Sequence, residues 1–423
     1  MLKSERSADP DSTEVLVENF FRHEYGRLVA VLGRQLGHRD IELIEDAVQS
    51  ALMSALEAWP ISGRPTNPSA WLFRVAKNNL WSILRQTGRR RRILEERREE
   101  LLPLGDLVFP SHEEIQDDLL RMLFACCDQA LPPASQLVLA LKTLCGFSVE
   151  EIALRLFTSE ANVYKRLGRA RRVLLEADGF PAELTSAQFA SRVPAVVRVV
   201  YLLFTEGYLS SHAEAAVRTE LCLESLRLGL LLAESPVGRV PEVSALMALM
   251  HLHAARFDAR VDGAGALLLL EEQDRELWDV EQIAEGLRWL GLSAEGDRFS
   301  RYHAEAGIAA EHCLSPSFAE TRWDRIVELY LMLESIAPSP VHRLNRAVAT
   351  AEWKGAGEGL SVLESSKPPS WLAESYMWQA VLADLHRRVG NAAVAREHWE
   401  QAMQEAPTQA IVNLLRRRFE ALL

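Results

Sequence analysis

The chain is poor in the residues that build disulfide frameworks and metal sites. It has five cysteines in 423 residues, and none has the CxxC spacing or the nearby histidine pair of a zinc site. We therefore expect reduced, buried thiols and no bound metal. The five are Cys126, Cys127, Cys145, Cys222 and Cys313.

Long apolar runs are also lacking. The start of the chain, MLKSERSADP, carries no apolar run behind its charges, as a secretory signal would. The apolar stretch 266–270 is far too short to cross a bilayer. With 48% hydrophobic and 25% charged residues, the composition is that of an ordinary globular protein. We expect a cytoplasmic protein that has no membrane partner.

Catalytic motifs are missing as well. There is no nucleophile elbow, phosphate-binding loop or HExxH spacing. His251 and His253 are two residues apart, so on a helix they face different sides and are poorly placed as joint ligands. We expect no catalytic residue, no cofactor and no enzymatic activity.

Positive charge is scarce overall but concentrated in two places. The formal net charge is −12, which by itself argues against a nucleic-acid partner. Residues 60–98, however, carry ten Arg and Lys against two Glu, and residues 155–172 carry six basic residues against one Glu. Two basic islands in an acidic chain indicate local contacts with a polyanion.

Apolar residues recur at helical spacing along nearly the whole chain, so the sequence predicts an all-α protein. One such helix runs from Glu42 to Trp59, and proline and glycine then cluster from Pro60 to Pro68. Asn67 followed by Pro68 predicts a helix N-cap with proline at the first helical position, and this helix should run to about Gln86.

The second basic island has the pattern of a helix-turn-helix. Ser148 and Glu151 form a capping box, a turn is expected at 157–159, and a second helix buries Val163 and Leu167. Its other face is polar and basic, which suits base edges and phosphates in a major groove. An ordinary solvated hairpin is the alternative, but the cap, the turn and the one-sided charge together favour DNA binding. The candidate contacts are Asn162, Lys165, Arg166, Arg169 and Arg172.

The first island pairs a polar loop with an aromatic and basic helix. Aromatic and arginine planes can hold unpaired bases, and cations can follow the phosphate backbone. Trp71, Phe73 and Trp81 taken singly are better explained as packing residues, so the loop and the cations are the stronger candidates. These are Arg64, Asn67, Arg74, Lys77, Asn78 and Arg85.

These blocks resemble the second and fourth conserved regions of extracytoplasmic-function sigma factors of the sigma-70 family. The segments that resemble the second region are Glu45–Gln49, Trp71–Asn78 and the basic run 85–92. The segment that resembles the fourth region is Ser148–Arg171. Two positions depart from the family pattern: Ser82 replaces an aspartate and Asn162 replaces a threonine.

The resemblance implies a role for each candidate surface. Glu45, Asp46 and Gln49 would dock on the β′ clamp helices of RNA polymerase, and the fourth region would meet its β flap. The candidates of the first basic island, from Arg64 to Arg85, would read and melt the −10 promoter element. The candidates of the helix-turn-helix, from Asn162 to Arg172, would read the −35 element. The protein would bind core polymerase and promoter DNA without a cofactor.

The rest of the chain is a long helical extension. We expect sigma domains at 13–87 and 112–178, a linker at 88–111 and a helical domain at 185–423. Near 340–410, small and aromatic residues have the spacing of tetratricopeptide helix pairs, which could bind a protein or peptide partner and regulate the sigma domains. The positions are Gly390, Ala395, Trp399, Ala402 and Pro407.

Two other interpretations remain open. A helix-turn-helix regulator with a helical-repeat sensor domain explains residues 147–172 and the repeats equally well. It does not explain the two helices that precede them, the one with Glu45, Asp46 and Gln49 on it and the aromatic and basic one. A pure repeat scaffold leaves both basic islands unexplained.

Overall fold

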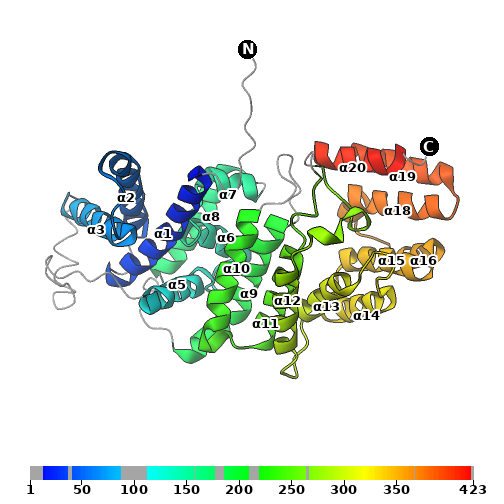
Figure 1. The fold of residues 1–423 in the computed structure, drawn as a ribbon, viewed down its shortest axis with the longest axis horizontal. Coiled ribbons are helices and arrows are strands. Elements are labelled where there is room, and N and C mark those ends of the chain that lie inside the picture. The colour runs from blue at the N-terminus through cyan, green and yellow to red at the C-terminus, as the bar shows by residue number, and fades with distance from the viewer. Residues whose placement is uncertain are drawn as a thin grey trace, which may run out of the picture. The chain divides into compact units, whose positions relative to one another are not determined.

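The computed structural model describes residues 13–36, 41–86, 112–156, 158–176, 185–208, 219–262, 266–365 and 367–420. Over these ranges the protein is helical without a named strand, apart from one isolated bridge between Val261 and Leu267. The predicted all-α fold is therefore confirmed. The chain divides into two compact units, Met1–Val199 (unit 1) and Val200–Leu423 (unit 2) (Figure 1). The predicted linker 88–111 lies outside the described residues.

Unit 1 begins with three helices: α1 (Thr13–Leu36), α2 (Ile41–Ser62) and α3 (Pro68–Gln86). The predicted cap of α3 is present, because Asn67 Oδ1 accepts a hydrogen bond from the Ala70 amide at 3.0 Å. Helix α2 does not stop at Trp59 as expected but continues through Pro60 to Ser62. Proline is tolerated there because it removes only one hydrogen bond, in the last turn, and Gly63 ends the helix with a φ of 81°.

From residue 112 on, the described part of unit 1 contains α5 (His112–Cys126), α6 (Pro133–Thr143), α7 (Val149–Arg155) and α8 (Glu160–Glu176). The capping box at the start of α7 forms as predicted: Glu151 N donates to Ser148 Oγ at 3.0 Å and Ser148 N donates to Glu151 Oε2 at 2.7 Å. On α8, Val163, Leu167 and Ala170 are all buried. The core around them holds the larger buried side chains Phe124, Leu139, Phe147 and Ile152.

Helix α9 (Ser186–Tyr208) contains the boundary between the two units. Its segment Ala187–Tyr208 is long and apolar enough to cross a membrane by composition, and 39% of it is buried. In unit 1 its Arg192 forms an ion pair with Asp128 at 2.6 Å and Phe189 meets Phe124 edge to face. These contacts are what the core helix of a globular protein makes.

Unit 2 continues with α10 (Thr219–Glu234), α11 (Pro241–Ala254), α12 (Val280–Ser293), α13 (Arg301–Leu314) and α14 (Trp323–Ile336). Helix α11 is apolar around most of its circumference and is buried along most of its length, which marks it as the central helix of this unit. Short 3₁₀ turns occur at Pro236–Gly238, Leu270–Glu272 and Arg275–Leu277.

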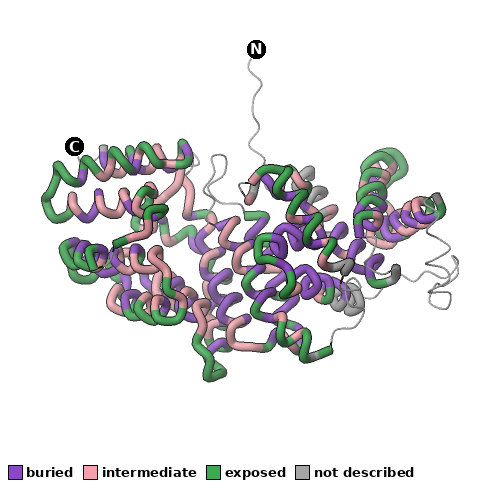
Figure 2. Tube along the Cα trace, turned by 180° about the vertical axis from the view of Figure 1, so that it is seen from behind, coloured by how far each residue is buried: buried purple, intermediate pink, exposed green. Residues whose placement is uncertain are grey.

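The final helices are α15 (Pro340–Lys354), α16 (Ala356–Glu364), α17 (Ser370–Ala373), α18 (Tyr376–Arg388), α19 (Ala392–Gln404) and α20 (Gln409–Glu420). They lie in successive layers in unit 2 (Figure 1). Buried and exposed residues alternate along each helix (Figure 2), and Ala395 and Ala402 are buried as the repeat pattern requires. The helical extension is thus confirmed, and its assignment as tetratricopeptide repeats stays a prediction.

The predicted thiols also lie where expected. Cys126, Cys127, Cys145 and Cys222 are buried, and Cys313 is partly buried. Burial raises the pKa of Cys222 to about 12 and that of Cys313 to about 11. Because the thiolate is the reactive form of cysteine, these side chains act as small apolar residues of the core.

Candidate nucleic-acid interface

Helix α8 presents a polar and basic face next to its buried stripe. Asn162, Lys165, Arg169 and Arg172 are exposed and Arg166 is partly exposed, so all five predicted contacts lie off the stripe that packs against the core. Tyr164 lies among them and is 61% exposed. An exposed aromatic ring on a basic helix can contact a sugar or a thymine methyl group. Tyr164 is therefore a further candidate contact, which a search for charged residues does not find.

Helix α3 separates its packing residues from its polar residues in a similar way. Phe73 is buried, and Trp71 packs edge to face on Trp59 at 5.6 Å, which confirms that these aromatic residues serve the core. Arg74, Asn78 and Arg85 are exposed. Lys77 is half-buried, and this burial lowers the pKa of its ammonium group. The exposed face therefore offers cations and amides rather than aromatic planes.

The loop before α3 is held by side chains of unit 1. The guanidinium group of Arg64 lies over the ring of Phe20, 4.9 Å from its centroid, and Phe20 in turn neighbours Trp59. The side-chain oxygen of Asn67 is occupied by the cap of α3, so a DNA contact by Asn67 would fall to its amide nitrogen. The expected reading loop 61–67 is thus partly helical at Ile61 and Ser62 and anchored at Arg64.

The expected docking face on α2 is divided. Asp46 and Gln49 are exposed, whereas Glu45 is buried, with 4% of its surface exposed. The docking role expected for all three requires exposed side chains, and Glu45 does not meet this requirement because Arg171 of α8 covers its carboxylate. Two exposed apolar residues, Met53 and Leu56, follow Gln49 at helical spacing. They extend the exposed face along α2. In the sequence, only their position off the buried stripe indicates that they are exposed.

Glu45 is held by a side chain of α8. Arg171 of α8 donates from Nη2 to Glu45 Oε2 at 2.6 Å and from Nη1 to Glu42 Oε1 at 2.5 Å. Thr143 Oγ1 donates to the other oxygen of Glu45 at 3.2 Å. Burial raises the pKa of Glu45, and Arg171 opposes this rise. The second basic island is therefore joined to α2 through two acidic residues, Glu42 and Glu45.

A second contact joins the same two groups of helices. A Cβ atom added to Gly26 of α1 would lie 2.2 Å from the carbonyl oxygen of Leu144, at the end of α6. Nearby, Arg34 of α1 forms an ion pair with the buried Asp118 of α5 at 2.9 Å. Because only glycine fits at position 26, the backbones of α1 and α6 approach more closely than ordinary side chains would allow. We call this packed arrangement of α1–α3 against α5–α8 the closed form of unit 1.

Comparison with known proteins assigns the same two groups of helices. Residues 20–90 match sigma-70 region 2 and residues 121–174 match sigma-70, region 4. The chain belongs to the sigma-70 family. Residues 192–294 match a family of unknown function (DUF6596), so this family member carries an additional domain after region 4.

Two relatives illustrate the extent of the similarity. An uncharacterized protein, R00370, of Rhizobium meliloti (strain 1021) is 34% identical over 394 residues, which cover 91% of each chain. A probable RNA polymerase sigma factor of Haemophilus influenzae is 26% identical over 152 residues, which cover 32% of this chain and 77% of the relative. No solved structure gives a significant match. As a sigma-70 family protein, the chain is a transcription initiation factor.

Proposed function

We propose that the chain is a sigma factor of the extracytoplasmic-function type, which binds core RNA polymerase in the cytoplasm and opens promoter DNA. The observation that supports this most directly is the pair of separate polar and basic faces on α3 and α8, one in each matched sigma region. Helix α8 would read the −35 element as a duplex in the major groove. Helix α3 and the loop before it would hold the −10 element as a single strand.

Polymerase docking falls to α2. Asp46 and Gln49 are exposed there and would meet the β′ clamp helices, with Met53 and Leu56 adding apolar area to the contact. Region 4 would meet the β flap. Glu45 can join the docking face only after Arg171 leaves it, because the guanidinium group covers its carboxylate in the closed form.

The closed form cannot reach both promoter elements at once. The −10 and −35 positions are about 25 base pairs apart, which is roughly 85 Å at 3.4 Å per pair. In the closed form the recognition helix instead touches α2 directly, through Arg171 and Glu45. When fully extended, the expected 24-residue linker could span at most roughly 80 Å, which is similar to the distance between the two promoter elements. We therefore infer that polymerase binding separates regions 2 and 4, and that the Arg171–Glu45 contact belongs to the free protein.

Unit 2 is proposed to regulate the sigma regions or to add polymerase contacts. It is acidic on balance, with 32 Asp and Glu against 23 Arg and Lys over residues 185–423. Stacked helix pairs such as α15–α16 and α18–α19 form the kind of surface on which tetratricopeptide-like domains bind proteins or peptides.

Gel filtration with purified core polymerase tests the proposal against a helix-turn-helix regulator. The full chain should co-elute with core polymerase in the absence of DNA, and the D46A/Q49A variant should not. The E400A/Q401A variant removes an equally exposed acidic and amide pair from α19 and should co-elute like the wild type. A chain that binds promoter duplexes but never co-elutes with core polymerase would be a regulator instead.

A further inference from the structure

Unit 2 contains an apolar cavity of about 510 Å³ between α14, α15, α18 and α20. This volume lies within the range of known ligand sites, which are mostly apolar with a few placed polar groups. Most of the wall is aliphatic or aromatic, and the polar residues of the lining are Glu271, His312, Asn345, Glu352, Asp384, Arg388 and Arg418. The apolar lining includes Tyr330, Leu344, Val348, Tyr376, Ile411 and Leu415.

One side of the cavity is closed by a segment of the chain rather than by a helix. Residues 266–272, which we call the strap, contribute Leu269 and Leu270 to the lining. Directly after the strap, Gln273 is buried and accepts a hydrogen bond from Arg256 at 3.2 Å, and Trp278 is buried beneath Arg256 and Arg275. The strap is thus short and anchored at both ends, because at its start Leu268 N donates to Arg260 O at 2.8 Å and Asp262 N donates to Ala266 O at 2.9 Å.

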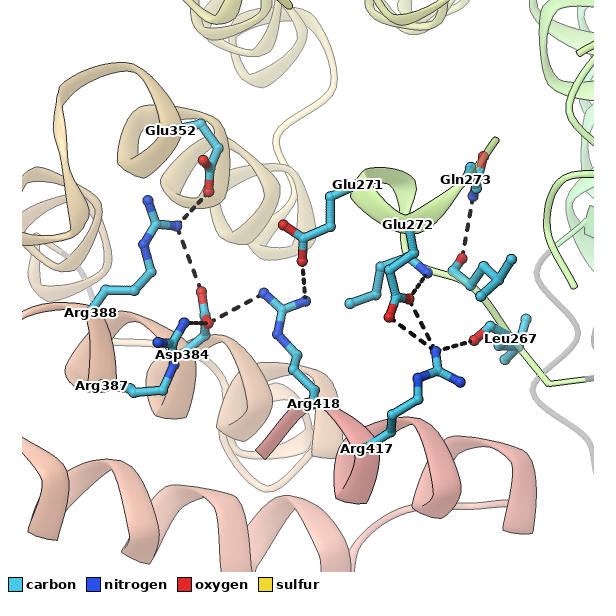
Figure 3. Close-up of polar contacts among 12 residues, drawn as sticks. Leu267, Glu271, Glu272, Gln273, Glu352, Asp384, Arg387, Arg388, Arg417 and Arg418 are labelled. Atoms are coloured by element: carbon cyan, nitrogen blue, oxygen red, sulfur yellow. Dashed lines mark hydrogen bonds and ion pairs between the residues drawn. The ribbon is translucent and has the colours of Figure 1, made fainter. Parts of the chain in front are cut away.

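Two neighbouring arginines of α20 hold the strap in place (Figure 3). Arg417 donates to the main-chain oxygen of Leu267 at 2.8 Å and to Glu272 Oε2 at 3.0 Å. Arg418 lies 3.5 Å from Glu271 Oε1. The strap is therefore bound as a peptide would be, through one carbonyl group, two consecutive carboxylates and two leucines directed at an apolar wall.

The arginines that hold the strap belong to a wider network of charges. Arg418 also contacts Asp384 Oδ1 at 3.3 Å, and Arg388 pairs with Asp384 and with Glu352 of α15 (Figure 3). When the strap carboxylates leave, Arg417 loses its contact with Glu272, and Arg418 loses Glu271 but stays paired with Asp384. A new pair of carboxylates can then bind there without rearrangement of the helices.

We propose that this cavity and the Arg417–Arg418 pair form a binding site for a partner protein segment that carries two aliphatic residues followed by two acidic residues. The strap sequence Leu269-Leu270-Glu271-Glu272 is the internal occupant, and a partner segment displaces it. A polypeptide fits better than a small apolar ligand, because Arg417 already binds a main-chain carbonyl as well as a carboxylate.

The proposal extends the regulatory role suggested for unit 2, but it does not depend on promoter opening. Its test measures peptide binding to the full chain, so it can fail while the proposed sigma function stands. The probe is a fluorescent peptide with the sequence of residues 266–274, read by fluorescence anisotropy. The control peptide has glutamine in place of both glutamates.

Three variants define the expected result. E271Q/E272Q weakens the internal competitor and should bind the probe about five-fold more tightly, since each exposed ion pair lost contributes a modest free energy. R417A/R418A should bind at least about five-fold more weakly than wild type. R322A/R325A removes two exposed arginines elsewhere in unit 2 and should bind the probe as wild type does.

A second measurement separates lost binding from lost folding. R417K/R418K keeps the charge but not the two-pronged geometry, so it should melt like the wild type and still bind the probe more weakly. Saturating probe should also increase hydrogen exchange over residues 266–272. Equal affinity of the two peptides, or unchanged binding by R417A/R418A, would overturn the proposal. The proposal would also be overturned if a fatty acid displaced the probe from R417A/R418A. The site would then be one for a small apolar ligand.

Discussion

At the scale of single residues, the basic face of α8 allows a quantitative expectation. Arg166 and Arg169 lie one turn apart on α8 and off its buried stripe. Each phosphate contact contributes about 0.9 to the slope of log affinity against log salt concentration. We expect R166A/R169A to weaken binding to a −35 duplex and to make this slope less steep by up to about 1.8. A salt titration of anisotropy measures it.

The control for that experiment is R322A/R325A, which removes the same charge from exposed positions in unit 2. It should bind the duplex with the wild-type slope. If both double variants lost affinity equally, net charge rather than the α8 face would be responsible.

The cations of α3 should act at a later step than those of α8. Arg74 is exposed and Lys77 is half-buried on α3, and neither lies on α8. We expect R74A/K77A to reduce permanganate reactivity of the −10 bubble in the polymerase complex while binding to an isolated −35 duplex stays near the wild-type level. A bubble of normal reactivity would show that strand separation is not guided by this face.

At the scale of elements, the sequence predicts correctly those features that depend on residues close together in the chain. The Ser148–Glu151 capping box, the Asn67 cap and the buried stripe Val163–Leu167–Ala170 each depend on residues within one or two turns, and all three are present. The burial of Glu45 depends instead on Arg171, 126 residues away. No periodicity in α2 distinguishes a carboxylate that meets solvent from one that meets another helix.

The same limit applies to the contact between α1 and α6, and it leads to a prediction. In G26A the new methyl group would lie 2.2 Å from the Leu144 carbonyl oxygen, so α1 and α6 must move apart. We expect faster hydrogen exchange in α6 and around Glu45 in the free protein. We also expect tighter binding to core polymerase, because less of the closed form has to be opened.

Gly168 provides a matched control for Gly26. It is also a helical glycine of unit 1, but an added Cβ would meet nothing within 4 Å. G168A should therefore stabilise α8 by about 0.5–1 kcal/mol, the usual gain of alanine over glycine in a helix, without faster exchange in α6. If G26A exchanged no faster than G168A, the closed form would not depend on this close approach.

At the scale of the whole molecule, a buried carboxyl group in unit 1 and two buried histidines in unit 2 make stability depend on pH with opposite sign. Burial raises the pKa of Glu45 in unit 1, so the folded unit binds a proton more readily than the unfolded chain. The stability that this proton provides is present at low pH and is lost as pH rises through the raised pKa. In unit 2, burial and neighbouring arginines lower the pKa of His312 to about 3 and that of His253 well below its usual value.

For these histidines the unfolded chain is the state that binds protons, so unit 2 loses stability as pH falls below about 6.5. At pH 5 the loss from His312 alone is up to about 2 kcal/mol, from 1.5 pKa units at 1.36 kcal/mol each. Urea denaturation at pH 7.5 and pH 5 measures the change. On acidification, H312Q should lose less stability than the wild type. E45Q should lose more, because it lacks the carboxyl group whose protonation stabilises the folded protein at low pH. Equal losses in H312Q and the wild type would mean that His312 is protonated in the folded protein. The cavity that it lines would then carry a positive charge.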